Sequence, residues 1–165
     1  MQRTMTEKDT YLQNFEREYQ TTLKVLKAYP TDKADLQPSA KSKKALDLAW
    51  MLVLNQMVPV PTLENQLDPA KLPAAVKTWN EIIPALEKAH RETMARLQKS
   101  TEKEWNDDIK MPVAPKTMGE IRTGDALWFF LSDTIHHRGQ FTVYLRMAGG
   151  KVPSIYGPTA DEPWF

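Results

Sequence analysis

The sequence predicts an all-α protein, a four-helix bundle with long crossover connections. Three observations lead to this prediction. Four stretches place apolar residues three and four positions apart, as on one face of an α-helix. Most of the 12 prolines fall between these stretches, where proline ends or precedes a helix. Almost no segment shows the two-residue alternation of a β-strand. Amphipathic helices of this kind bury their apolar faces against one another.

The first helix is expected at residues 6–28. Its apolar face repeats at spacings of three and four and consists of Tyr11, Phe15, Tyr19, Thr22 and Leu26. Pro30 ends this helix, because proline disfavours the helical conformation of the residue before it.

The second helix is expected at residues 42–57. Its apolar side consists of Leu48, Ala49, Leu52 and Val53. Ser42 is a suitable N-cap, and Pro59 with Pro61 is expected to end the helix.

The third helix is expected to begin at Pro73, a residue that the first helical turn tolerates. A bundle seam follows, made of Val76, Trp79, Ile83, Leu86, His90, Thr93 and Leu97. Pro84 lies inside this pattern, so we expect a kink there.

The segment 101–119 is polar and contains prolines, and we expect a long connection that serves as a pocket lid or a plain connector. The fourth helix is expected at residues 123–147, with Gly149 and Gly150 as its C-terminal stop. The tail, residues 151–165, is expected to pack on the bundle.

Length and composition indicate one soluble domain, residues 1–165. The formal net charge is +1 and there is no cysteine. Low net charge gives no attraction to nucleic acid or to an anionic membrane. The lack of cysteine excludes disulfides and thiolate metal sites and suits a reducing cytoplasm. We see no apolar run of membrane-spanning length, so we expect a cytoplasmic protein with no membrane or nucleic-acid partner.

The run SDTIHHRGQF, residues 132–141, contains the candidate chemistry. Asp133 and His137 are four residues apart, so they share a helix face and suit a divalent transition metal. His136 points about 100° away from His137 and is a poor partner for the same ion. The alternative is an imidazole hydrogen-bonded to Asp133 in a packed core.

Two other residues raise questions of their own. His90 lies on an apolar seam, which favours a packed, hydrogen-bonded core residue over a metal ligand. Gly139 lies inside a helix, where glycine costs about 1 kcal/mol relative to alanine. Its presence indicates close approach of another helix, within the chain or across a dimer.

The stretch HHRGQFTVYLRMAGGKVPSIYGPTAD, with SAKSKKALDLAW upstream, strongly resembles the DinB-like family of bacterial four-helix proteins. The resemblance covers most of the chain. It implies a divalent metal held by one histidine of the second helix and two side chains of the fourth. Here the fourth-helix positions are Asp133 and His137. The second-helix position is Met51, a soft thioether where the family has histidine.

The resemblance implies two alternative functions. One is an enzyme that uses zinc, nickel or iron and acts with a low-molecular-weight thiol, as a transferase or isomerase. Its substrate pocket would include Asn55, Gln140 and Tyr144, with Arg138 a further contact for a substrate carboxylate. The other is a non-catalytic, stress-related homodimer or small-ligand-binding module, in which Met51 fills the place of the missing ligand.

Overall fold

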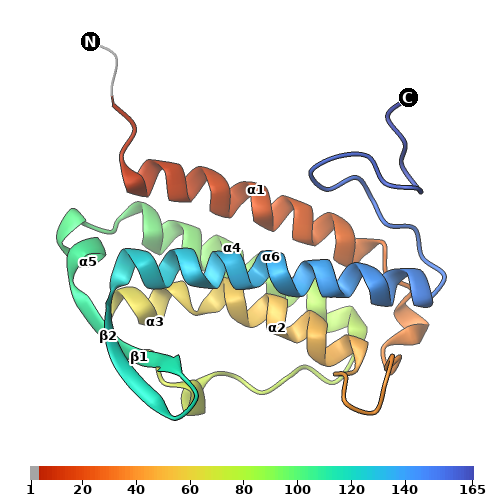
Figure 1. Ribbon diagram of the computed structural model, residues 1–165, viewed down its shortest axis with the longest axis horizontal. Helices are drawn as coiled ribbons and strands as arrows, with labels where there is room; N and C mark the ends of the chain where they lie inside the picture. Colours follow the sequence, from red (N-terminus) through yellow and green to blue (C-terminus); the bar gives the residue numbers. More distant parts are fainter. Residues whose placement is uncertain (1–3) are drawn as a thin grey trace.

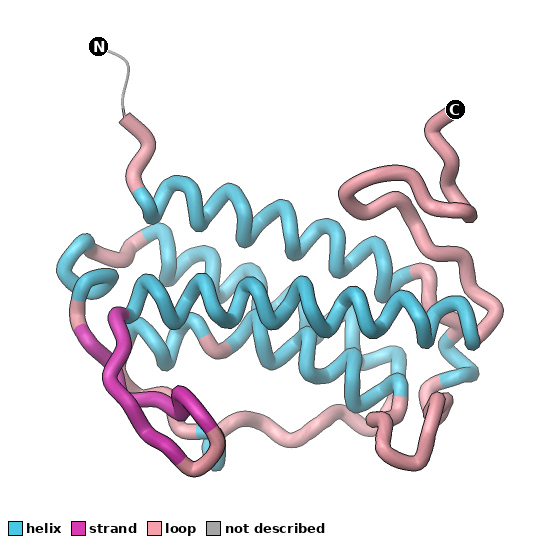
Figure 2. The backbone as a smooth tube through the Cα atoms, in the orientation of Figure 1, coloured by secondary structure: helices cyan, strands magenta, loops and turns pink. Residues whose placement is uncertain are grey.

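The computed structural model describes residues 4–165 and shows a bundle of four long helices (Figures 1 and 2). The long helices are α1 (Glu7–Lys27), α2 (Ala45–Met57), α4 (Ile82–Gln98) and α6 (Thr123–Met147). α1 and α6 run in one direction, and α2 and α4 run in the other. α1 and α2 each pack against both α4 and α6, so α1 lies diagonally opposite α2, and α4 lies diagonally opposite α6. The predicted fold class is confirmed.

Because α2 and α4 are parallel, their connection must return along the whole length of the bundle. Residues 64–81 make this crossover, which includes the 3₁₀ turns Pro69–Lys71 and Trp79–Glu81. Figure 1 shows it passing along the edge of the bundle. The expected long crossover connection is present, and it gives the helices an up-down-down-up order.

The expected second helix, residues 42–57, needs correction at its start, while its end at Met57 is as expected. The helix begins at Ala45, and its N-cap is Lys44, which makes no side-chain capping bond. Ser42 instead pairs with the hydroxyl of Ser39 at 2.8 Å. Pro59 does not end helical structure but starts the short helix α3 (Pro59–Leu63). Proline is well placed there, because the first position of a helix has no use for its missing N–H.

The third helix begins at Ile82, nine residues after the predicted start at Pro73. The preceding Thr78 and Glu81 form a capping box around the 3₁₀ turn. A capping box marks the start of a helix, but the apolar spacing continues before it and suggested an earlier start. Pro84 therefore lies in the first turn of α4, where a missing N–H breaks no helical hydrogen bond. The predicted kink inside the helix was wrong for this reason.

The segment 101–119 is structured, contrary to the prediction of an irregular connection. It contains α5 (Glu102–Asn106) and β1 (Asp108–Ala114), which pairs antiparallel with β2 (Thr117–Arg122). Ile109 and Met111 lie on the buried face of β1 and pack with Ala126 of α6. The hairpin is short and contains a proline, which weakens its strand signal.

The fourth helix, α6, has the predicted bounds. Gly149 follows its C-cap with a positive φ of 83°. Its N–H bonds to the carbonyl of Arg146, and the N–H of Gly150 bonds to that of Leu145. This is the Schellman pattern, in which glycine adopts the left-handed conformation without a Cβ penalty. The expectation from the glycine pair is confirmed.

One continuous stretch, Ala45–Leu63, is apolar and long enough to cross a membrane by composition alone. The prediction that no such stretch exists was therefore wrong. Its most apolar window is 61% buried inside the bundle. Trp50 and the fully buried Leu52 and Val53 belong to the main apolar core. The core helix of a soluble bundle has this character, because it must bury nearly its whole surface.

Candidate functional site

Asp133 and His137 lie one turn apart on α6 and contact each other. Nε2 of His137 is 3.3 Å from Oδ2 of Asp133, and their side chains are 17% and 29% exposed. From α2, the amide nitrogen of Asn55 donates to the same Oδ2 at 2.9 Å. The pair is thus held against the core on one side and open to solvent on the other.

The separation of the two donor atoms suits a metal ion. Two ligands that each lie about 2.1 Å from one ion, at 90° to 110° to each other, are roughly 3.0–3.4 Å apart. The distance of 3.3 Å from Nε2 to Oδ2 falls in this range. His137 and Asp133 therefore fit two neighbouring ligand positions without rearrangement.

The third ligand position is altered. Two hydrogen bonds join α6 to α2 and the residues just before it: the Tyr144 hydroxyl donates to the carbonyl of Lys43, and the Asn55 amide donates to Asp133. The two helices are antiparallel, so positions toward the start of α2 lie beside positions toward the end of α6. Met51, one turn before Asn55, therefore lies level with His137. Its thioether is a soft, weak ligand. Within residues 4–165, no three His, Cys, Asp or Glu side chains are grouped so that they hold an ion. The residues fit two positions of a metal site and leave the third to another donor.

His136 and His137 do not converge on one point, as expected from their spacing. Their rings are 5.3 Å apart and tilted by 58°. Gln140 connects them instead: its Oε1 lies 3.2 Å from Nδ1 of His137, and its Nε2 lies 2.9 Å from Nε2 of His136. Gln140 therefore fixes the orientation of the His137 ring, and His136 in turn fixes Gln140.

A cavity of about 430 Å³ opens beside His137. Gln140, Tyr144 and Val143 of α6 line it, together with Leu48 and the segment that precedes α2. Of the predicted pocket residues, Gln140 and Tyr144 are thus brought together. Asn55 is not part of the wall, because its amide is directed at Asp133. Residues 101–119 do not line the cavity either, so their predicted role as a lid finds no support.

Arg138 is not available to a substrate, contrary to prediction. Its side chain is 1% exposed and binds the equally buried Glu18 at 2.7 Å. Tyr156 of the tail donates to the same Glu18 oxygen at 2.6 Å. Burial raises the pKa of the Glu18 carboxyl, but the bonds from Tyr156 and Arg138 outweigh it and hold the pKa below its usual value. The group joins α1, α6 and the tail.

His90 belongs to the packed core, as its apolar seam indicated. Its ring stacks on Tyr19 at 3.6 Å between centroids. Nε2 lies 2.8 Å from Glu16, and Nδ1 lies 3.0 Å from Gln56. Burial lowers the pKa of His90, against the opposing effect of the Glu16 carboxylate. The ring is more than 90% buried, and its polar partners are Glu16 and Gln56, not Asp133 or His137.

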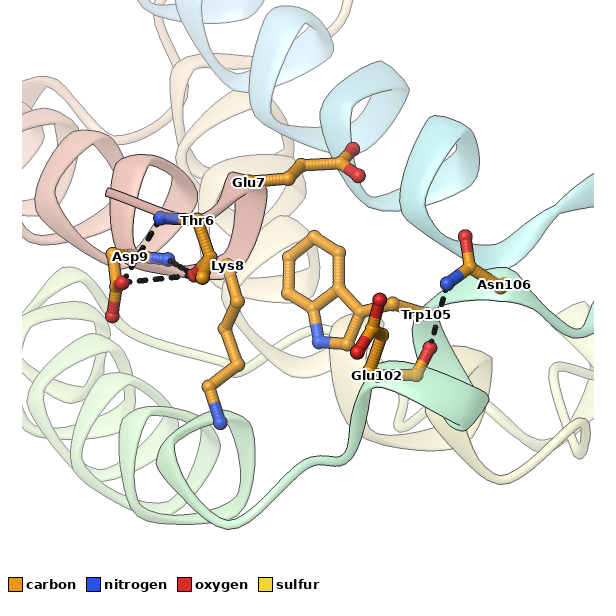
Figure 3. A pocket seen from close by; sticks show the side chains of 7 residues that line it. All are labelled: Thr6, Glu7, Lys8, Asp9, Glu102, Trp105 and Asn106. Carbon is orange, nitrogen blue, oxygen red and sulfur yellow. Dashed lines mark hydrogen bonds between the residues drawn. The ribbon is translucent and has the colours of Figure 1, made fainter. Parts of the chain in front are cut away.

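A second depression, of about 410 Å³, lies where α1 begins and α5 crosses the end of the bundle (Figure 3). The charged side chains from α1 and its N-cap region, Glu7, Lys8 and Asp9, are engaged in the fold. Glu7 binds Arg122 at 2.8 Å, and Lys8 donates to the carbonyl of Ser100 at 2.6 Å. No histidine of the described residues lines this depression, whereas His137 lines the first.

Comparisons with known proteins agree with this description. The sequence profile of the DinB family matches residues 1–163. An uncharacterised protein of Bacillus subtilis strain 168, YrdA, is 46% identical over 43 residues, a match that spans about a quarter (26%) of each chain.

Solved structures with the same fold have low sequence identity. A DinB-like protein of Bacillus cereus has a TM-score of 0.72 at 20% identity, over 88% of this chain and 95% of its own. The DinB-like YjoA of B. subtilis has a TM-score of 0.70 at 18% identity, over 85% and 92%. YfiT of B. subtilis, described as a probable metal-dependent hydrolase with an unusual four-helix bundle topology, has 0.64 at 15% identity, over 90% and 92%.

Proposed function

The chain belongs to the DinB family, and from this premise we propose that it is a divalent-metal-dependent enzyme that acts with a low-molecular-weight thiol, of the transferase or isomerase type. His137 and Asp133 would hold zinc, nickel or iron. The observation that carries the proposal is the 3.3 Å between Nε2 and Oδ2, beside an open cavity. The description of the YfiT neighbour as a probable metal-dependent hydrolase is consistent with a metal in this fold.

The altered third position explains why a thiol is a suitable co-substrate. Two protein ligands bind a divalent ion weakly, so a donor from the substrate is needed to complete the site. When bound, the ion would lower the pKa of a thiol and hold it as the thiolate, which is the nucleophilic form. The thioether of Met51 gives this position an apolar, soft neighbour that suits sulfur better than water.

The protein's own residues would bind and orient the second substrate. Gln140 is held by His136 and by His137, so its amide has a fixed direction at the cavity wall. The hydroxyl of Tyr144 is committed to the carbonyl of Lys43. Its ring therefore contributes an apolar surface, and Gln140 contributes the polar contact.

A second candidate function is a non-catalytic small-ligand-binding module, and one observation favours it. The amide nitrogen of Asn55 already satisfies Asp133 at 2.9 Å, and Met51 supplies an apolar side chain where a third ligand would stand. In that case the cavity would bind a small molecule without metal. For either candidate we expect a cytoplasmic protein with no nucleic-acid partner, in keeping with the net charge of +1 and the lack of cysteine.

Calorimetric titration of tag-free protein distinguishes the two candidates. Nickel or zinc is added alone and then with cysteine as a simple thiol. We expect weak binding alone, tighter binding with the thiol, and neither in His137→Ala. Met51→His restores a third ligand and should tighten metal binding about a hundredfold, since structural zinc gains about 3 kcal/mol per ligand.

The control is Gln20→His, which adds an exposed histidine to α1 and should change nothing. If Met51→His binds metal while the wild-type chain binds none even with thiol, the metal-free candidate stands. If the wild-type chain and Met51→His both fail to bind, α6 does not provide a metal site and the enzyme proposal is wrong.

A further inference from the structure

The cavity beside His137 carries positive charge at its mouth. Lys41 and Lys43 line it, and none of its lining residues is an aspartate or a glutamate. Both lysines are exposed. Within residues 4–165 neither ammonium has an ion-pair partner, whereas the adjacent Lys44 binds Asp35 at 2.7 Å. The described part of the chain therefore leaves two positive charges at the cavity without a counterion.

This excess of positive charge is local. The formal net charge of the whole chain is only +1, so the chain as a whole does not attract anions strongly. A cleft lined by charges of one sign raises the local concentration of ligands of the opposite sign. A neutral ligand gains nothing from the two lysines, and a cation is repelled by them. The wall of the cavity therefore favours an anion.

Much of the remaining wall is apolar. Pro38, Leu48, Val143 and Tyr144 line the cavity. The hydroxyl of Tyr144 is held by the carbonyl of Lys43, so its ring is the part that contributes to the wall, and Val143 is 57% exposed. A ligand that covers these side chains gains hydrophobic stabilisation in proportion to the apolar area that it buries. The wall therefore suits a molecule with an apolar body and one charged end.

The backbone of the lysine segment and His137 lie at different levels of the cavity. The carbonyl of Lys43 accepts the Tyr144 hydroxyl at 2.9 Å, so this segment lies beside Tyr144. Figure 1 shows the connection before α2 at the end of the bundle where α6 ends. Along an α-helix the step from His137 to Tyr144 is two turns, about 10 Å. A ligand whose charged end meets the lysines therefore reaches His137 only if its body is elongated.

We propose that the cavity selects a small organic acid with an elongated apolar body. Lys41 and Lys43 bind its negatively charged end, the apolar wall contacts its body, and its other end lies beside His137. The two lysines thereby take the role of acid contact that the sequence suggested for Arg138, which is buried. This inference names the substrate class of the same cavity and rests on the proposed function for the reaction at His137. Binding of the acid itself needs no metal.

Three probes that share one skeleton and differ in charge test the inference: phenylbutyrate, phenylbutanol and phenylbutylammonium. Each is titrated into isotope-labelled, metal-stripped full-length chain in phosphate-free buffer, and NMR amide shifts report binding. We expect the acid to bind about tenfold more tightly than the alcohol, and the ammonium to bind most weakly, because only the acid pairs with the lysines. Added salt should reduce this preference by screening. The amide signals of Ser42, Gln140 and Val143, which line the cavity, should shift.

Two double variants identify the charges responsible. Lys41→Ala/Lys43→Ala should bind the acid only as tightly as the alcohol. The control, Lys99→Ala/Lys116→Ala, removes the same charge from two exposed lysines that do not line the cavity, and it should keep the preference of the wild-type chain. Equal binding of acid and alcohol by the wild-type chain overturns the inference, as does an unchanged preference in the first variant. Failure of every probe to bind, or shifts confined to other parts of the chain, also overturns it.

These titrations contain no metal, so their outcome is separate from that of the metal titration. A preference for the acid, together with no metal binding in the calorimetric experiment, would support the acid site and refute the enzyme. Metal binding at His137 without a preference for the acid would refute the acid site alone.

Discussion

Two pairs of polar side chains begin at neighbouring residues of α6 and differ in almost every physical respect. Arg138 and Glu18 are each 1% exposed and lie 2.7 Å apart. His137 and Asp133 are 17% and 29% exposed and lie 3.3 Å apart. The first pair joins two helices and the tail. The second stays within one helix, and its His137 lines a cavity of about 430 Å³.

The comparison teaches that burial, and not residue type, separates the pair that holds the fold from the pair that is available for chemistry. A buried charge must keep its partner, because water cannot replace it. A half-exposed pair can exchange its partner for an ion or a ligand at little cost. The 100° between consecutive helix positions is sufficient to place adjacent residues in these two environments.

The largest expected effect follows from removal of the buried cation. Arg138→Met should lower the free energy of unfolding by about 3–5 kcal/mol, because it leaves Glu18 buried without its main partner. Urea denaturation measures this. The matched control is Arg17→Met, since Arg17 also contacts Glu18 but is 65% exposed, and it should cost about 1 kcal/mol or less. Equal losses of unfolding free energy in the two variants would show that burial does not decide which contact to Glu18 holds the fold.

A smaller effect is expected where the tail meets this pair. Tyr156→Phe removes the hydroxyl that donates to Glu18 at 2.6 Å. A hydrogen bond to a charged group contributes about 1.5–3 kcal/mol, and we expect a loss of stability in this range. Tyr29→Phe, which removes only a bond to the carbonyl of Lys33, should cost about 1 kcal/mol. The reverse order would show that the tail is not held by Glu18.

The pH dependence of stability sharpens the contrast for a third group, His90. Its folded pKa is lowered by burial from the ordinary value of 6.5. Below that pH the unfolded chain therefore binds a proton that the folded chain does not. Stability is lost as the pH falls through 6.5, by at most about 1.4 kcal/mol per pH unit. Denaturation at pH 7 and pH 5.5 measures the loss, and His90→Gln should reduce it. An unchanged loss in that variant would exclude His90 as its source.

The smallest effect is expected at the partly exposed pair, His137 and Asp133. His137→Ala, in the absence of metal, should change the free energy of unfolding by no more than about 0.5–1 kcal/mol, because solvent reaches the pair and screens its interaction. The same urea experiment measures it. A loss as large as that of Arg138→Met would mean that His137 is part of the fold.

More of the fold than of the site could be predicted from the sequence. The bounds of α6 were predictable because its apolar pattern is long and Gly149 ends it. The start of α4 was not, because Val76 and Trp79 continue the apolar spacing through a segment that is not α-helical. The hairpin escaped notice because pairing of short strands depends on contacts distant in the sequence.

At the site, the contact between Asp133 and His137 followed from their spacing of four. The burial of Arg138 was missed although a signal existed. It repeats the apolar spacing of Leu131, Thr134 and Phe141, and Glu18 does the same between Phe15 and Thr22. A helical-face analysis that included charged residues would have paired them. No sequence pattern indicated that the segment before α2 would line the cavity, because its position depends on the path of an irregular connection.

The measurement that tests the central claim most directly is thermal unfolding of the wild-type chain and His137→Ala, each with and without nickel. Our account expects similar melting temperatures without metal, a rise on adding nickel for the wild-type chain, and no rise for His137→Ala. A wild-type chain that does not respond, or a variant that responds equally, would contradict the claim that the partly exposed pair on α6, His137 and Asp133, is the functional one.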